Sequence, residues 1–86
     1  MRAIVLDFHE FDTAREAHAY LAEHLDFPAY YGHNLDALYD CLTELSEDVC
    51  VTVVESGKAF ERGFEQVFLD AAEDGRHFFC TGFTAS

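Results

Sequence analysis

Basic residues are scarce in this 86-residue sequence, which has five Lys and Arg, 17 Asp and Glu, and a formal net charge of −12. No Lys or Arg occurs from Glu16 through Gly57. The phosphates of nucleic acids and of anionic membranes would repel such a chain. The composition therefore argues against both as partners. It favours a basic protein, whose encounter with this chain would be assisted by electrostatic attraction.

The residues that usually carry chemistry are few or scattered. The three cysteines, Cys41, Cys50 and Cys80, have no CxxC spacing, so we expect reduced thiols rather than a disulfide framework. The histidines show no HxxxH spacing, the glycines form no phosphate-binding loop, and no serine lies in a G-x-S-x-G motif. Asp36 and Asp40 could form a glycosidase pair, but adjacent turns of an exposed helix give no water-excluded cleft. We expect no enzyme, no metal and no cofactor.

Long hydrophobic runs are also missing. The first apolar run ends at Asp7, too early for the apolar region of a signal peptide, and no segment is long enough to span a bilayer. We therefore expect a cytoplasmic protein. The length predicts one domain over residues 1–86 with one modest core.

Apolar and capping patterns predict alternating strands and helices. Thr13 with Glu16 has the spacing of a capping box, and Pro28 must end the first helix. Strands are expected at residues 2–8, 49–54 and 77–81, and helices at residues 13–27, 34–45 and 59–73. This order predicts an α/β fold, a small three-stranded parallel sheet packed with about three helices.

Several local expectations accompany these elements. The consecutive apolar residues of the first strand are typical of a strand covered on both faces or of a strand in a parallel sheet. Gly63 lowers the helix propensity of its segment, and the tail from Gly82 is expected to be loose. Gly32 is free to take a positive φ, and Gly75 is a natural residue to follow a helix. Two histidines of the first helix, His18 and His24, are expected on its solvent side or edge. His33 is expected to be exposed, and Cys41 is expected to be half-buried.

The segment 27–45 carries the most informative pattern. Asn34 is a good N-cap for its helix. Leucines on one face predict a core stripe, at Leu35, Leu38, Leu42 and Leu45. A second face is acidic, with Tyr39 beside Asp36, Asp40, Thr43, Glu44 and Glu47. The like-charge pairs Asp36–Asp40 and Asp40–Glu44 each disfavour the helix by roughly 0.2–0.5 kcal/mol. This face is either a solvated surface without a task or a docking surface for a cationic partner.

The sequence YYG-x-NLDAL-x-DCLT, from Tyr30 to Thr43, resembles the loop and second helix of the barstar family. Barstars are intracellular inhibitors of a small secreted bacterial ribonuclease. The resemblance implies a barstar-like fold. The chain looks several residues shorter than the family between the acidic helix and Gly75, so a short connecting helix is expected to be trimmed or missing.

The resemblance also implies a set of partner-binding residues: Tyr30, Asn34, Asp36, Tyr39, Asp40, Thr43, Glu44 and Asp70. Asp40 matches the central acid, which stands in for an RNA phosphate among basic active-site residues, and Asp36 matches its neighbour one turn earlier. Tyr30 and Asn34 match loop residues at the contact, and Asp70 matches a flanking acid on a later helix. Tyr39 and Leu45 stand where the family has tryptophans.

Two functions follow from these observations. The first is an inhibitor that occludes the active site of a basic, barnase-like, extracellular-type ribonuclease in a one-to-one complex, as in toxin–antitoxin or immunity systems. The alternative is an acidic mimic of nucleic acid that sequesters a basic partner other than a nuclease.

Overall fold

A computed structural model describes residues 2–85 of the chain. Its elements in order are β1 (Arg2–Asp7), the 3₁₀-helix η1 (Phe8–Glu10), α1 (Ala14–His24), α2 (Leu35–Thr43), β2 (Val49–Glu55), α3 (Glu61–Asp74) and β3 (Phe78–Ala85). The strands lie in the order β1-β2-β3, and both neighbouring pairs are parallel. The predicted α/β class and three-stranded parallel sheet are confirmed. None of the described helices is long and apolar enough to cross a membrane.

Local capping signals explain where two helices begin. The Thr13 side chain accepts a hydrogen bond from the Glu16 backbone N–H at 3.3 Å, and α1 starts at the next residue after Thr13. Asn34 caps α2 in the same way. An N-cap oxygen satisfies one of the backbone N–H groups that the first helical turn leaves unpaired. Both starts were therefore predictable from short stretches of sequence.

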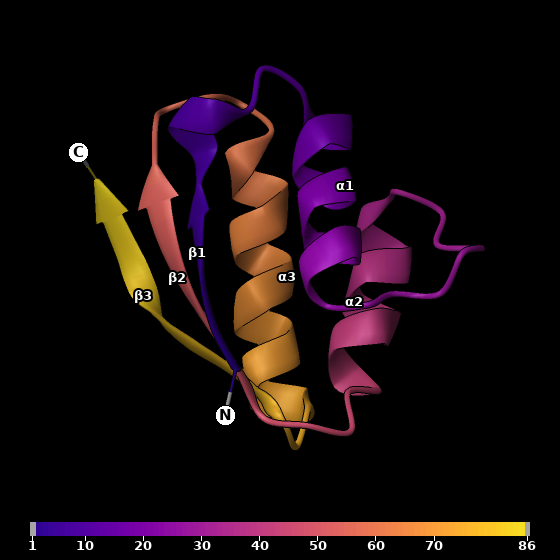
Figure 1. The fold of residues 1–86 in the computed structure, drawn as a ribbon. Helices are drawn as coiled ribbons and strands as arrows, with labels where there is room; N and C mark the ends of the chain where they lie inside the picture. Colours follow the sequence, from indigo (N-terminus) through magenta and orange to yellow (C-terminus); the bar gives the residue numbers. More distant parts are fainter. Residues whose placement is uncertain (1, 86) are drawn as a thin grey trace.

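The helices lie on one side of the sheet, with α3 beside the strands (Figure 1). Alternate residues of β2, Val49, Val51 and Val53, are buried against them. On the opposite face Val5 is 54% exposed and Phe79 44% exposed. Of the two settings expected for the first strand, the parallel sheet is confirmed and cover on both faces is not. The helices described among residues 2–85 all lie on the other side of the sheet.

Aromatic side chains fill the space between the sheet and α3. Phe64 and Phe68 of α3 are fully buried. The Phe64 ring lies 5.6 Å from that of Phe8, and the Phe68 ring lies 5.8 Å from that of Phe78, both measured between centroids. Full burial of one such side chain stabilises the fold by about 1.5–3 kcal/mol. These contacts fix α3, and through it α2, relative to the sheet.

The start of α3 is held by its own first residue. The Glu61 carboxylate is buried and accepts hydrogen bonds from the Ser56 N–H at 2.9 Å, the Ser56 hydroxyl at 2.6 Å and the Lys58 N–H at 2.8 Å. This anchored turn connects β2 directly to α3. No helix lies between them in the described chain, which agrees with the expected loss of a short connecting helix.

The last strand is longer than predicted. Its backbone continues past Thr81 to Ala85, paired with β2 beyond an irregularity at Val51 and Thr52. Gly82, at φ 128°, occupies a backbone conformation that glycine reaches without strain, and there the register shifts. The expectation of a loose tail is therefore wrong for residues 82–85, and Ser86 lies outside the described residues.

Two glycines allow the helices to approach closely. A Cβ on Gly63 would lie 2.6 Å from Leu35 Cδ1, so this glycine makes room for α2, and α3 runs through it without a break. A Cβ on Gly75 would lie 2.7 Å from the Ala71 carbonyl oxygen and 3.5 Å from Thr43 Cα. Gly75 follows the helix as predicted, but with φ −83° rather than in the left-handed region. Its role is steric.

Candidate functional site

Helix α2 presents one face to the core and one to solvent. Leu38 and Leu42 are fully buried, whereas Asp36, Asp40 and Glu44 are exposed. The helix ends at Thr43, two residues before the predicted end. Leu45 and Glu47 therefore lie beyond the helix, although Leu45 is still partly buried against the core as predicted. Leu35, which was expected in the core stripe, is 38% exposed.

Asn34 and Thr43 use their polar atoms within α2 itself. Asn34 Oδ1 accepts from the Ala37 N–H at 2.8 Å, and its Nδ2 donates to the Gly32 carbonyl at 3.3 Å. The Thr43 hydroxyl donates to the carbonyls of Tyr39 at 3.0 Å and Asp40 at 3.1 Å. These two residues position the helix that carries the acids.

The 25–34 loop is anchored by one tyrosine and exposes the other. Tyr31 is buried, and its hydroxyl lies 2.6 Å from Nδ1 of the buried His18. Tyr30 is 88% exposed. The turn into α2 places the positive φ on His33, at 52°, and not on Gly32 as predicted. His33 is half-buried, which corrects its expected exposure, and its Nδ1 lies 3.0 Å from the Tyr31 carbonyl oxygen.

His18 is the clearest error in the predicted surface. It was expected on the solvent side of α1, but it is 3% exposed, and its ring centroid lies 4.6 Å from that of Phe64. Burial, with a smaller contribution from the charge of His33, lowers the pKa of His18 to about 4. The ring is therefore neutral near pH 7, and burial raises the pKa of its partner Tyr31. His24 is exposed, as expected.

A second acidic group lies where α2 meets α3. The Tyr39 hydroxyl donates to Asp74 Oδ2 at 2.5 Å, which raises the pKa of Tyr39, and the charges of Asp70 and Asp40 raise it further. Asp70 is exposed and accepts a hydrogen bond from Gln66 Nε2 at 3.0 Å. Asp74 was not among the predicted residues. Its spacing of one turn from Asp70 was the signal that could have found it.

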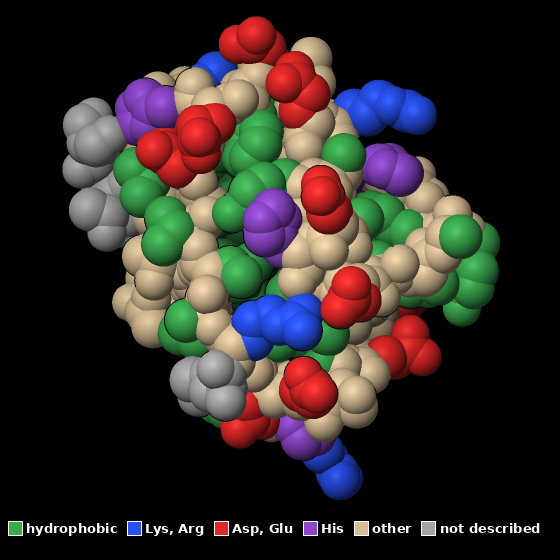
Figure 2. Space-filling view, in the orientation of Figure 1, with side chains coloured by type: hydrophobic (Ala, Val, Ile, Leu, Met, Phe, Trp, Pro, Cys, Tyr) green, Lys and Arg blue, Asp and Glu red, His purple; other side chains and the backbone are tan. Residues whose placement is uncertain are grey.

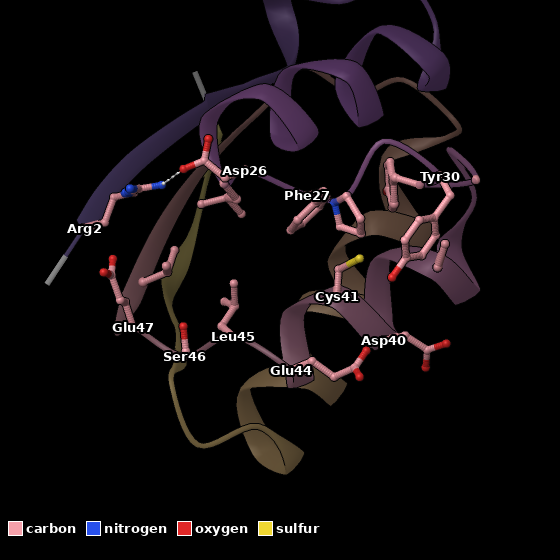
Figure 3. Close-up of a pocket in the computed structure, with 16 residues that line it drawn as sticks. Arg2, Asp26, Phe27, Tyr30, Asp40, Cys41, Glu44, Leu45, Ser46 and Glu47 are labelled. Carbon is pink, nitrogen blue, oxygen red and sulfur yellow. Dashed lines mark hydrogen bonds and ion pairs between the residues drawn. The ribbon is translucent and has the colours of Figure 1, made fainter.

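Tyr30, Asp40 and Glu44 line one groove, which runs between the 25–34 loop and α2 and has a volume of about 600 Å³. Figure 3 shows Cys41 pointing into it from α2, with Asp40 and Glu44 at its edge. Cys41 is half-buried, as predicted. Across the face shown in Figure 2, acidic side chains extend from one end of the molecule to the other, and basic side chains are few.

The predicted residues thus fall into three groups. Tyr30, Asp40 and Glu44 lie at the groove, while Tyr39 and Asp70 lie with Asp74 between α2 and α3. The third group is Asp36, on the first turn of α2, and the two residues Asn34 and Thr43, whose polar atoms serve the helix. Within residues 2–85, no three His, Cys, Asp or Glu side chains are placed to hold a metal ion.

Comparison with known proteins shows the family of this chain. A family model described as "Barstar (barnase inhibitor)" matches residues 1–81. The chain belongs to the barstar family. It is also 45% identical over 74 residues to the "Putative ribonuclease inhibitor YrdF" of Bacillus subtilis (strain 168), an alignment that covers 86% of this chain and 76% of that protein. Membership of the barstar family supports a ribonuclease-inhibitor role, and with it a non-enzymatic protein whose partner is a ribonuclease.

Proposed function

We propose that this barstar-family chain inhibits a small, basic, barnase-like ribonuclease by covering its active site in a one-to-one complex. The carboxylate of Asp40 would take the place of an RNA phosphate among the basic residues of the nuclease. Asp36 and Glu44 would flank it along α2, and Tyr30 would pack beside it from the loop. Tyr39, Asp70 and Asp74 would form the side of the contact nearest α3.

The observation that carries the proposal is the presentation of Asp36, Asp40 and Glu44. Asp36 and Asp40 are exposed on α2, which is capped by Asn34, and Glu44 is exposed at the residue that follows the helix. Among the described residues, no Lys, Arg or His forms an ion pair with any of them. Their charges are therefore available to a partner. A hydrogen bond from Arg or Lys to a carboxylate contributes about 1.5–3 kcal/mol.

Inhibition by covering an active site needs a rigid surface rather than a catalytic pocket. Leu38 and Leu42 are fully buried under the acidic face, so the carboxylates project from a helix that is packed into the core. A preorganised surface loses little conformational freedom when it binds. The net charge of −12 also favours rapid encounter with a basic protein.

The test is inhibition of RNA cleavage by a panel of barnase-like ribonucleases. The proposal expects stoichiometric loss of activity with at least one of them. It also expects Asp40→Ala to weaken that inhibition by roughly 100-fold or more, because two or more charge-assisted hydrogen bonds are lost.

Asp12→Ala is the matched control, because Asp12 is an exposed acid that precedes α1, whereas the 25–34 loop follows it. It should weaken inhibition by less than about 3-fold, as expected for a distant surface charge. Unchanged activity of every nuclease would contradict the proposal. Equal effects of the two substitutions would leave diffuse charge, and not the face of α2, as the source of binding.

A further inference from the structure

The groove beside Asp40 extends well beyond the predicted contact residues. From Tyr30 and Asp40 it continues along the chain that follows α2 to Glu47. Figure 3 shows Phe27 and Leu45 directed towards its interior. Its volume of about 600 Å³ lies within the range, about 300–1,000 Å³, of sites that enclose a ligand. No residue of α3 lines the groove.

The edge of the groove is negative and its floor is apolar. Asp40, Glu44 and Glu47 contribute carboxylates, and all three are exposed. The cation at the groove, Arg2, is already engaged. Its Nη1 lies 2.8 Å from the His24 carbonyl oxygen and 3.5 Å from Asp26 Oδ2. Within residues 2–85 no cation pairs with the three carboxylates at the edge.

An apolar floor under a carboxylate edge is complementary to one kind of side chain. Lys and Arg bury an aliphatic stem against apolar surface and keep the charged head at a polar edge. A purely apolar segment would leave the carboxylates without counter-charge, and an acidic segment would be repelled. The distribution of charge along the groove therefore selects a basic occupant.

We propose that a Lys or Arg side chain of the ribonuclease, from a surface segment outside its phosphate-binding site, occupies this part of the groove. The stem lies on Cys41 and Leu45, and the charged head lies between Glu44 and Glu47. This inference rests on the proposed function, and it adds a second contact beyond the one centred on Asp40.

The test compares two double variants of equal charge against the ribonuclease that the chain inhibits. Glu44→Gln with Glu47→Gln removes the charge at the edge of the groove, and both positions are exposed, so the fold should persist. Its complex should dissociate roughly 10-fold faster, as expected when a charge-assisted contact is lost. Glu10→Gln with Asp12→Asn changes two exposed acids before α1 and should alter dissociation by less than about 2-fold. Equal dissociation rates for the two double variants would overturn the inference.

A second measurement needs no nuclease and separates the two proposals. Titration of the ¹⁵N-labelled chain with N-acetyl-arginine amide should shift the amide signals of Cys41, Leu45 and Glu47, and the Glu44→Gln, Glu47→Gln chain should lose this response. Absence of these shifts in the wild-type chain would overturn the groove as a site for a basic side chain. If the shifts appear but no ribonuclease is inhibited, the proposed function fails and the site for a basic side chain stands.

Discussion

At the scale of single residues, the pair His18–Tyr31 determines how the 25–34 loop presents its aromatic side chains. The 2.6 Å contact between Tyr31 Oη and His18 Nδ1 lies in the core, and both residues are buried. A buried polar group is costly unless it has a partner, so each of the two requires the other. With Tyr31 held inward, the neighbouring Tyr30 is left 88% exposed beside Asp40. A buried histidine of α1 thus supports the surface that the 25–34 loop presents beside α2.

The depressed pKa of His18 predicts how stability depends on pH. In the unfolded chain His18 titrates near 6.5, but in the folded chain burial lowers its pKa to about 4. Between these values the unfolded state binds more protons, so stability is complete above pH 6.5 and falls as the pH decreases towards 4. At about pH 5 we expect a loss of about 2 kcal/mol from this residue.

Urea unfolding at neutral pH and at about pH 5 measures this loss. The control is His18→Gln, which cannot titrate and should lose less stability than the wild-type chain over the same interval. The same pH dependence in both proteins would show that the carboxylates, and not His18, are responsible.

At the scale of elements, α2 is a short helix whose acidic face works against its own stability. The pairs Asp36–Asp40 and Asp40–Glu44 are of like charge, and α2 has no basic residue in its last turn. Its stability depends on the cap at Asn34 and on the burial of Leu38 and Leu42. Helix α2 is thus stabilised by its N-terminal cap and by its buried face, and not by the acidic face that it presents.

The cap gives a prediction with a matched pair of variants. Asn34→Ala removes the 2.8 Å hydrogen bond to the Ala37 N–H and should lower the free energy of unfolding by about 1 kcal/mol, within a range of roughly 0.5–2 kcal/mol. Asn34→Asp keeps a capping oxygen and should stay close to the wild-type stability. Denaturant unfolding of the three proteins decides the point. Equal destabilisation by Ala and Asp would mean that Asn34 acts through a contact other than the cap.

The elements that were predicted correctly depend on short-range signals. Thr13 and Asn34 predict the starts of two helices because their side chains cap backbone N–H groups only three residues away. The β-branched run of β2 predicts a strand whatever its neighbours in the fold are. The errors depend on distant parts of the chain. Pairing with β2 extends β3 to Ala85, and Leu35 of α2 explains why residue 63 is a glycine. Neither contact is visible in a local window of sequence.

The candidate site divides in the same way. Spacing along one helix placed Asp36, Asp40 and Glu44 together, because positions four residues apart share a helix face. The hydrogen bond from Tyr39 to Asp74 spans 35 positions. The groove joins the 25–34 loop to the chain after α2, and the position of Glu47 on it depends on where α2 ends. These features follow from packing, so the spacing of residues could not reveal them.

At the scale of the whole molecule, the excess of negative charge is the feature that most affects binding. The formal net charge is −12, and the ion pairs among residues 2–85 engage Asp26, Asp7 and Asp48, none of which belongs to the predicted contact. The acids of α2 therefore add to a field of one sign. Such a field accelerates encounter with a basic partner and is screened by salt.

Screening predicts how binding responds to salt. Raising the ionic strength from about 0.01 M to about 0.15 M shortens the Debye length from about 30 Å to about 8 Å. Association with the ribonuclease should slow by roughly 10-fold or more, while dissociation should change much less. Stopped-flow mixing measures the two rate constants separately. A salt effect found mainly in dissociation would contradict long-range steering by the net charge.

The central claim, that Asp40 and its neighbours occupy the phosphate-binding site of a ribonuclease, is tested most directly by competition. The affinity of the chain for the inhibited nuclease is measured by calorimetry with and without a mononucleotide that binds the same active site. With the nucleotide at about ten times its own dissociation constant, the apparent Kd of the complex should rise by about 11-fold. An unchanged Kd would mean that the two bind together, which would contradict phosphate mimicry at the active site.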